Sequence, residues 1–263
     1  TKLNNDKKIG KIKISNDLNE VLKQANIIND NSNGYFDITA DPLIELWGFG
    51  YKNKKTHSIP SSKEINDALS LVNQKELFEL NSVNNEFYKK NKNLKLNLSS
   101  IAKGYGIDQI GNKLETLGIR NYLINIGGDL LAKGNNKNKK DWIIGIENPN
   151  LKEKLVKEII NVSDKGIASS GDYKNFFTKN NTKFSHIINP KTGKPIVHQT
   201  KSVTVVSYNA TNADGWATAL LAMGSKKGFK LAEKTGMAVL FIDEVNEKLI
   251  KIKSSEFKKL VKE

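Results

Sequence analysis

A carboxylate and a hydroxyl four residues apart, Asp214 and Thr218, fall in a segment whose apolar residues have a helical spacing. Residues at this separation lie on one face of a helix, so both side chains can face the same ligand. His186 precedes them in a strand-like run. Oxygen donors of this kind suit a hard cation bound to phosphate and do not suit zinc or iron. Taken alone, such a pair is more often solvated or helix-capping, and a lone His in an apolar strand is more often a core residue.

Four other segments have a distinctive order of glycines, small residues and acidic residues. They are residues 33–50 (NGYFDITADPLIELWGFG), 96–108 (LNLSSIAKGYGID), 121–134 (NYLINIGGDLLAKG) and 167–177 (IASSGDYKNFF). In this order and spacing, followed by residues 184–218, they closely resemble the FAD:protein FMN transferases, the ApbE family. The resemblance extends from about residue 33 to the C-terminus. It implies one transferase domain over residues 1–263, with the nucleotide in a cleft between two α+β lobes.

The resemblance also implies the roles of the site residues. Asp214, Thr218 and the backbone carbonyl of Ala102 would bind Mg²⁺, with FAD phosphate and water as the remaining oxygen ligands. His186 and Asp214 would be the catalytic residues. His186 is the best candidate for the base, because the ordinary pKa of His lies near neutral pH, and Asp172 is the second candidate. Alternatively, His186 hydrogen-bonds the pyrophosphate or orients the acceptor. The residues implied to contact FAD are Asp37, Ile38, Thr39, Ser99, Tyr105, Gly127, Gly128, Ser170, Gly171, Asp172, His186 and Ile188.

The implied reaction is a phosphoryl-group transfer. A Thr or Ser hydroxyl of an acceptor flavoprotein attacks the FMN-side phosphorus of FAD, AMP leaves, and a phosphoester bond joins FMN to the acceptor. Magnesium would neutralise charge on the pyrophosphate while the cleft aligns the reactants. Two alternatives stay open. One is a Mg²⁺-dependent FAD pyrophosphatase that releases FMN and AMP, and the other is a non-catalytic flavin-binding protein, which a missing Asp214 or Thr218 would favour.

The glycine-rich stretches match no common nucleotide-binding motif. There is no GxxxxGK[ST], which disfavours a Walker-type NTPase, and Gly104-Tyr105-Gly106 does not continue as GxGxxG, which disfavours a Rossmann site. Instead, the free amides of a helix that Ser99 or Ser100 caps would suit an anion.

Three further details concern the shape of the site. The pair Gly127-Gly128 is typical of a turn after a strand, and the small residues at 169–171 predict a tight loop beside the ligand. Asn97 stands where the family usually has Asp, and Ala217 stands where some relatives have an acid. We therefore expect the metal to bind weakly when no nucleotide is present. We also expect the carboxylate of Asp214 to lie on a helix surface that faces the cleft.

The composition excludes several other classes of protein. The chain of 263 residues has no cysteine, which excludes disulfides and thiolate metal sites, and its three His residues disfavour a multi-His zinc site. No apolar run approaches the roughly 20 residues that span a bilayer. The net charge is +14, but the lysines are spread along the chain. The even spread of lysines favours solvated surfaces over a nucleic-acid-binding face. The positive net charge would still favour binding to an anionic dinucleotide or to a membrane surface.

Short runs of alternating or helical periodicity predict the α+β class, with mixed, largely antiparallel sheets and packed helices. Many strands are separated by short turns, which favours antiparallel pairing. A capping box at Ser61–Glu64 predicts the start of one helix. We expect helices between Ser15 and Gly34 and at about 61–73, 99–118, 213–223, 226–234 and from 255. We expect strands at 77–80, 86–90, 94–98, 122–126, 142–146, 156–162, 185–188, 203–207 and 238–242.

The resemblance also raises expectations about location and partners. Family members normally have a segment before the stretch that corresponds to residues 1–5, so part of the cleft wall would come from outside this sequence and residues 37–39 would be more exposed. Restoring the upstream segment should tighten FAD binding by on the order of tenfold.

Family members modify subunits of membrane-bound redox pumps and other extracytoplasmic flavoproteins. We therefore expect an extracytoplasmic protein of a bacterium, anchored to the cytoplasmic membrane through a missing N-terminal segment, with no nucleic-acid partner.

Overall fold

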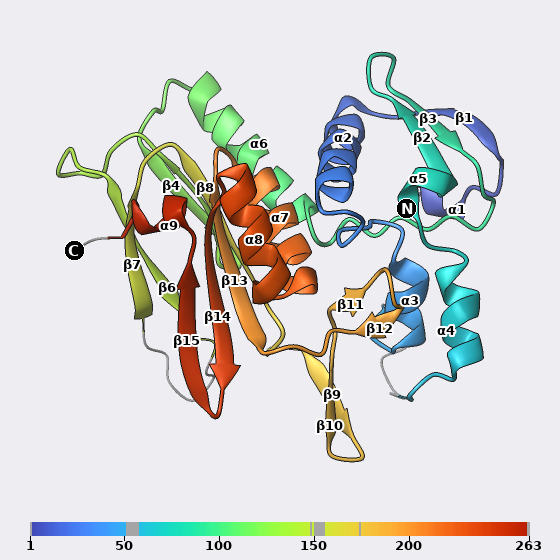
Figure 1. Cartoon of the computed structure of the whole chain (residues 1–263). Helices are drawn as coiled ribbons and strands as arrows, with labels where there is room; N and C mark the ends of the chain where they lie inside the picture. Colours follow the sequence, from blue (N-terminus) through green and yellow to red (C-terminus); the bar gives the residue numbers. More distant parts are fainter. Residues whose placement is uncertain (1, 51–57, 148, 150–155, 174, 262–263) are drawn as a thin grey trace. The chain divides into compact units, whose positions relative to one another are not determined.

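The computed structural model describes residues 2–50, 58–147, 149, 156–173 and 175–261. The chain divides into two compact units (Figure 1). Unit 1 consists of Thr1–Ser100 and Asn175–Ile196, and unit 2 consists of Ile101–Lys174 and Val197–Glu263. Every pair of strands in the described residues is antiparallel. With helices packed beside these sheets, the predicted α+β class is confirmed.

The N-terminal part of unit 1 is a three-stranded sheet with a long helix, α2 (Asn16–Asn31). This helix follows Ser15 as the sequence predicts, and the hydroxyl of Ser15 caps it by accepting the N–H of Leu18. Lys89 of the sheet is fully buried, and its ammonium donates to the carbonyls of Leu3 and Asp6, which ties the N-terminal segment to the sheet. The other elements are α1 (Lys2–Asn5), β1 (Gly10–Lys13), α5 (Gln74–Leu77), β2 (Phe78–Asn81) and β3 (Glu86–Lys89), with the strand order β1-β3-β2.

The rest of unit 1 is organised around aromatic side chains. Phe177 stacks on Phe184 with ring centroids 4.9 Å apart, and Trp47 stacks on Phe184 at 5.6 Å. The indole N–H of Trp47 donates to the carbonyl of Gly193 at 2.7 Å. The predicted capping box of Ser61 and Glu64 is present at the start of α4. The elements are α3 (Asp41–Leu46), α4 (Ser62–Leu69), β9 (Phe176–Lys179), β10 (Thr182–Ser185), β11 (Ile188–Asn189) and β12 (Lys194–Pro195).

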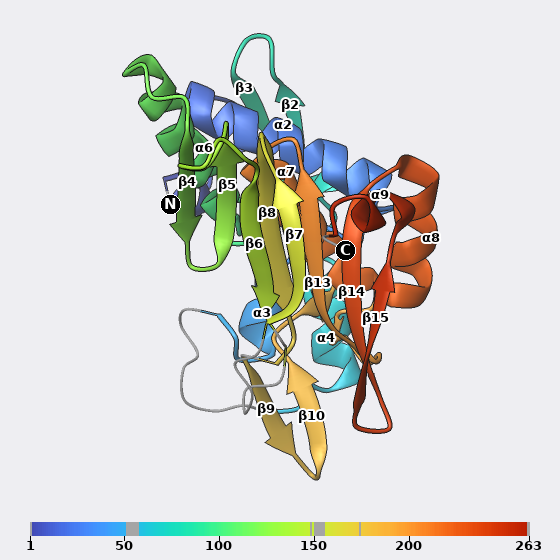
Figure 2. The same cartoon turned by 90° about the vertical axis from the view of Figure 1, so that its left-hand side faces the viewer.

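Unit 2 is built on a six-stranded sheet with the order β15-β14-β13-β8-β5-β4. Its strands are β4 (Tyr122–Ile126), β5 (Asp129–Lys133), β8 (Lys165–Gly171), β13 (Thr200–Ser207), β14 (Ala238–Val245) and β15 (Lys248–Lys253). Helices α6 (Ala102–Thr116), α7 (Ala210–Met223) and α8 (Ser225–Thr235) cover one face (Figure 1). The hairpin of β6 (Trp142–Glu147) and β7 (Val156–Val162) and the short helix α9 (Ser255–Lys258) cover the other face (Figure 2).

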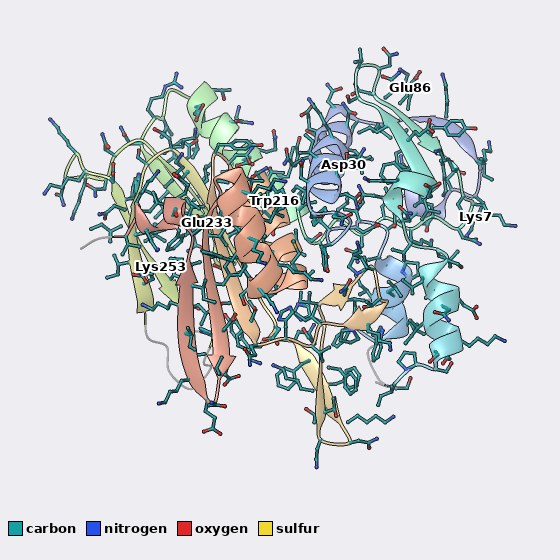
Figure 3. The ribbon with its side chains drawn as sticks, in the orientation of Figure 1. Lys7, Asp30, Glu86, Trp216, Glu233 and Lys253 are labelled. Atoms are coloured by element: carbon teal, nitrogen blue, oxygen red, sulfur yellow. The ribbon has the colours of Figure 1, made fainter. Side chains whose placement is uncertain are left out.

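Apolar burial and a few polar contacts hold these layers together. Ile144 and Ile160 of the hairpin pack into one core cluster with Ile167 and Leu240 of the sheet. Lys253 of β15 lies 2.6 Å from the carboxylate of Glu158 on β7. Figure 3 labels Glu233 of α8, whose carboxylate accepts the N–H and the hydroxyl of Ser255 at the start of α9. The central strands, which carry residues named in the sequence analysis, are therefore covered on both faces.

Three expectations about local structure are wrong. Residues 94–98 form no strand, because the backbone of Leu96 bonds to the side-chain amide of Asn4 instead of to a neighbouring strand. Residues 185–188 are not one strand, since β10 ends at Ser185 and β11 begins at Ile188. The small residues at 169–171 belong to the end of β8, a central strand, so the predicted loop begins only at Asp172. Helix α7 packs on β8.

Candidate active site

The helices α6 and α7 cap each other with carboxylates. The first N–H groups of a helix have no partner within it and need an outside acceptor. The carboxylate of Asp108 on α6 accepts the N–H groups of Ala210 and Thr211 at 2.9 and 2.8 Å, at the start of α7. In return, Oδ2 of Asp214 on α7 accepts the N–H of Gly104 at 2.9 Å, at the start of α6. The two contacts fix the N-terminal end of each helix relative to the other.

The predicted capping of α6 by Ser99 or Ser100 is wrong. Helix α6 begins at Ala102, and its N-cap residue is Ile101, which provides no capping side chain. The side chain of Asp214 takes this capping role. A cap from another helix cannot be seen in the residues that precede the helix, which explains why the sequence pattern pointed to a nearby serine.

Gly104 is required by the close approach of the two helices. A Cβ added at Gly104 would lie 2.3 Å from the carbonyl oxygen of Ala210 and 2.8 Å from Cα of Thr211. Both neighbours are backbone atoms, so they cannot rotate away. Gly104 therefore allows α6 to pack against α7 and to place its N–H on Asp214.

Asp214 is buried, with 6% of its surface exposed, and is not the surface carboxylate that the sequence suggested. Its pKa is raised to about 6, first by loss of hydration and second by the charge of Asp129; the Gly104 N–H and the charge of Lys103 act in the opposite direction. A bound divalent cation would offset this cost of burying the carboxylate. The environment of Asp214 thus fits a cation-binding role.

The other predicted metal ligands lie on the same two helices. Ala102, the first residue of α6, is exposed and precedes Gly104 by two residues. Thr218 lies one helical turn after Asp214, and its hydroxyl is 3.3 Å from that of Ser170 on β8. One carboxylate, one hydroxyl and one backbone carbonyl are hard oxygen donors that suit Mg²⁺. Over the described residues, no group of three or more His, Asp or Glu side chains could hold a metal ion.

Two charged residues that the sequence analysis did not single out lie beside Asp214. The ammonium of Lys103 is 2.9 Å from Oδ2 of Asp129, whose side chain is 2% exposed. Asp129 begins β5 directly after the Gly127-Gly128 turn, and Lys103 lies in the first turn of α6. The position of Lys103 in the sequence could have indicated this pair. A lysine in the first turn of a helix is disfavoured by the helix dipole, so its presence there indicates a specific partner.

Apart from Tyr105, the remaining predicted residues of unit 2 lie at the ends of its strands. Gly127 and Gly128 connect β4 to β5, and both have positive φ, +60° and +94°, as a two-residue hairpin turn requires. Ser170 and Gly171 end β8. Asp172 follows, is 6% exposed, and donates its N–H to the carbonyl of Lys201 on β13. The side chain of Tyr105, in the first half of α6, is half-buried.

In unit 1, the predicted FAD-binding turn is held together by its own polar groups. Oδ1 of Asp37 accepts the N–H and the hydroxyl of Thr39, at 2.7 and 2.5 Å, and Oδ2 accepts the N–H of Gln74. Burial raises the pKa of Asp37, while these hydrogen bonds lower it. Ile38 and Thr39 are almost fully buried, and the carbonyl of Ile38 accepts the N–H of Asn97 at 2.7 Å. Asp37 therefore caps this turn with its carboxylate.

Asn97 and Ser99 form a second polar turn in unit 1. The amide nitrogen of Asn97 donates to Oδ1 of Asp41 at 2.9 Å, and its amide oxygen accepts the N–H of Ser99. A carboxylate at position 97 could not donate to Asp41, so the amide is the chemically matched group here. Ser99 is exposed.

His186 and Ile188 lie between β10 and β12 of unit 1. Nδ1 of His186 is 2.8 Å from the carbonyl oxygen of Asn175, and its ring lies edge-on to Phe49 at 6.2 Å. Because a carbonyl can only accept, Nδ1 carries the proton and Nε2 is the basic nitrogen. Ile188 is 7% exposed and packs in the aromatic core with Trp47. No role was predicted for the other two histidines, His57 and His198. His57 lies outside the described residues.

The predicted site residues thus form two groups. The structure brings Ala102, Asp214, Thr218 and Ser170 together in unit 2, around the start of α6 and the middle of α7. The second group belongs to unit 1 and consists of Asp37, Ile38, Thr39, Ser99, His186 and Ile188.

The chain is similar to proteins of one family along most of its length. A sequence model described as the ApbE family matches residues 1–241. The FAD:protein FMN transferase of Haemophilus influenzae is 38% identical over 258 residues, which cover 95% of this chain and 72% of that protein. The protein of the same name from Vibrio cholerae is 37% identical over 239 residues, which cover 90% of this chain and 70% of that protein.

Solved structures give the same result. The flavin transferase ApbE of Vibrio cholerae superposes with a TM-score of 0.87 at 34% identity and covers 98% of this chain and 81% of that one. The apo form of the Pseudomonas stutzeri flavinyl transferase ApbE superposes with a TM-score of 0.88 at 30% identity, and the match covers 98% of this chain and 79% of that one. Sequence and fold together therefore show that the chain belongs to the ApbE family and is an enzyme of the flavin transferase class.

Proposed function

We propose that this protein transfers FMN from FAD to a Thr or Ser hydroxyl of an acceptor flavoprotein, in a Mg²⁺-dependent reaction that releases AMP. The names of the relatives support FAD as the substrate and a protein as the acceptor. The observation that carries the proposed chemistry is the buried carboxylate of Asp214, fixed at the junction of α6 and α7. A carboxylate placed in this way suits a cation that accompanies a phosphate group.

The proposed step is a displacement at phosphorus. The acceptor hydroxyl oxygen forms a bond to the FMN-side phosphorus of FAD, and the bond from that phosphorus to the bridging oxygen breaks. The electron pair of that bond leaves with AMP, and the hydroxyl proton passes to a base. His186 suits this role, because the carbonyl of Asn175 holds the proton on Nδ1 and keeps Nε2 basic.

The residues that would hold Mg²⁺ are Asp214, Thr218 and the carbonyl of Ala102. When bound, the ion supplies charge neutralisation on the pyrophosphate. Asp214 would be the charged protein ligand of this set. The hydroxyl of Ser170, 3.3 Å from that of Thr218, would orient the Thr218 hydroxyl.

The test is to incubate the protein with FAD, Mg²⁺ and a purified acceptor flavoprotein, and to measure the acceptor mass. The expected result is an added FMN mass that disappears with excess chelator, with Asp214→Asn, and when the modified acceptor hydroxyl residue is changed to Ala. Free AMP should form in equal amount to the adduct. Release of FMN and AMP without any adduct would show the FAD pyrophosphatase instead, and bound but unchanged FAD would show a flavin-binding protein.

We further propose that the protein acts outside the bacterial cytoplasm, anchored to the membrane, on an acceptor such as a redox-pump subunit. The resemblance to the family supports this proposal. No helix within the described ranges has the length and apolarity to cross a membrane. Fractionation of cells that express the full-length protein tests the location, and recovery in the cytoplasmic fraction would contradict it.

A further inference from the structure

The ion pair of Lys103 and Asp129 has no part in the reaction as described above, although it lies beside Asp214. Its two charged groups are 2.9 Å apart. Lys103 immediately precedes Gly104, whose N–H donates to Asp214, and the charges of Lys103 and Asp129 both act on Asp214. The pair is therefore part of the environment of the proposed phosphate and metal site.

The two members of the pair differ in burial. The side chain of Asp129 is 2% exposed, whereas that of Lys103 is 38% exposed. A buried carboxylate needs a fixed partner because it has lost its hydration. The ammonium has three donor hydrogens, so one bond to Asp129 leaves donors for another anion. This arrangement suits a lysine that is held in place by Asp129 and presented to a ligand.

The position of Lys103 in α6 supports the same interpretation. The first turn of α6 contains no acidic residue. A lysine here adds to the positive end of the helix dipole instead of offsetting it, which favours a nearby phosphate. Its Cδ lies near Gly127 of the turn before Asp129, since a Cβ added at Gly127 would be 3.9 Å from that atom.

We propose that Lys103 binds the pyrophosphate of FAD and that Asp129 is a positioning residue, which acts by holding the Lys103 ammonium beside Asp214. Lys103 then balances phosphate charge from the side of α6, and Asp129 prevents the ammonium from turning into solvent. Because this inference rests on the proposed function, the wild-type protein is first tested for the FMN adduct.

The experiment measures the affinity for FAD and for riboflavin, which lacks phosphate, in excess chelator. The variants are Lys103→Met, Lys103→Arg, Asp129→Asn and the double variant Lys103→Met/Asp129→Asn. Lys133→Met is the matched control, because Lys133 also forms an ion pair in unit 2, 3.8 Å from Glu115. Thermal unfolding of each variant is recorded alongside.

Lys103→Met should weaken FAD binding by on the order of tenfold, the worth of one charge-assisted hydrogen bond, and should leave riboflavin binding unchanged. Lys103→Arg should retain most of the affinity. Asp129→Asn should weaken FAD binding less than Lys103→Met, and should have no further effect once Lys103 is Met. Lys133→Met should bind FAD as the wild type does.

Equal FAD affinity for Lys103→Met and the wild type would overturn the proposal, as would equal losses for FAD and riboflavin. Additive losses in the double variant would show that Asp129 does not act through Lys103. If the wild type forms the FMN adduct and the variants give any of these contrary results, only the inference about Lys103 and Asp129 is contradicted. A wild type that binds FAD but forms no adduct contradicts only the proposed function.

Discussion

The carboxylate of Asp214 accepts the backbone N–H of Gly104 at 2.9 Å, which joins the middle of α7 to the first turn of α6. Asp214 and Ala102, two proposed metal ligands from different helices, are thereby set in a fixed relation, because Ala102 lies two residues before Gly104. A single hydrogen bond thus has a structural role as a helix cap and a proposed functional role in shaping the metal site.

The two roles of Asp214 can be separated by comparing Asp214→Asn with Asp214→Ala. Both variants remove the charge, so both should lose transfer activity by about 10²-fold or more. Only Asn keeps an oxygen that can accept the Gly104 N–H, so the Asn variant should be more stable than the Ala variant by about 1 kcal/mol. Denaturant unfolding and adduct mass measure the two effects. Near-wild-type transfer by Asp214→Asn would mean that another residue holds the metal.

The raised pKa of Asp214 predicts how stability depends on pH without metal. Its pKa in the folded protein, about 6, lies above the ordinary value of an Asp carboxyl, so the folded state favours the protonated form. The contribution of Asp214 to the free energy of unfolding should therefore fall as the pH rises from about 4 to about 6, by up to about 3 kcal/mol, and should stay low above this range.

The measurement is the difference in unfolding free energy between the wild type and Asp214→Asn across this range in excess chelator. Asn does not titrate, so the difference isolates Asp214. A difference that does not change with pH would contradict the raised pKa. Since metal binds the ionised carboxylate, the apparent affinity for Mg²⁺ should decrease below about pH 6.

Two glycines of α6 provide a matched test of the helix crossing. Gly104→Ala places a Cβ 2.3 Å from the Ala210 carbonyl oxygen, whereas a Cβ at Gly106 meets nothing within 4 Å. Gly104→Ala should lower the stability by on the order of 2 kcal/mol through this clash. Gly106→Ala should raise it by up to about 1 kcal/mol through helix propensity. Thermal unfolding checks both, and equal effects of the two substitutions would rule out a close contact at Gly104.

Substitution of His186 distinguishes a base from a residue that only binds substrate. If Nε2 accepts the acceptor proton, His186→Gln should lower kcat by about 10²- to 10⁴-fold with little change in the affinity for FAD. Steady-state kinetics and FAD titration of the same preparation measure the two quantities. A raised KM for FAD with unchanged kcat would assign His186 to pyrophosphate binding instead.

Asn97→Asp tests the polar turn of unit 1. The substitution would place a second carboxylate against Asp41, where Asn97 now donates at 2.9 Å. We expect a loss of about 1–3 kcal/mol at neutral pH, smaller at low pH, where one carboxyl is protonated. The double variant Asn97→Asp/Asp41→Asn restores one donor and one acceptor and should recover stability. If the double variant is as unstable as Asn97→Asp, the loss has another cause.

Where a helix boundary depends on adjacent residues, the sequence by itself was sufficient. Ser15 caps α2, and Ser61 with Glu64 forms the predicted box at α4. Gly224 follows the last residue of α7 with positive φ. The hydrogen bonds at these ends connect residues no more than a few positions apart, so local residue types determine them. The motifs that identify the ApbE family are likewise readable from residue order alone.

The tertiary structure decided the features that depend on distant partners. The cap of α6 comes from Asp214, 110 residues away, and not from the neighbouring serines. Leu96 bonds to Asn4 instead of joining a sheet. The burial of Asp214 and its proximity to the Lys103–Asp129 pair follow from the packing of α6, α7 and β5. A side chain's hydration and its charged neighbours are set by which elements meet in space, and residue spacing along the chain does not contain that information.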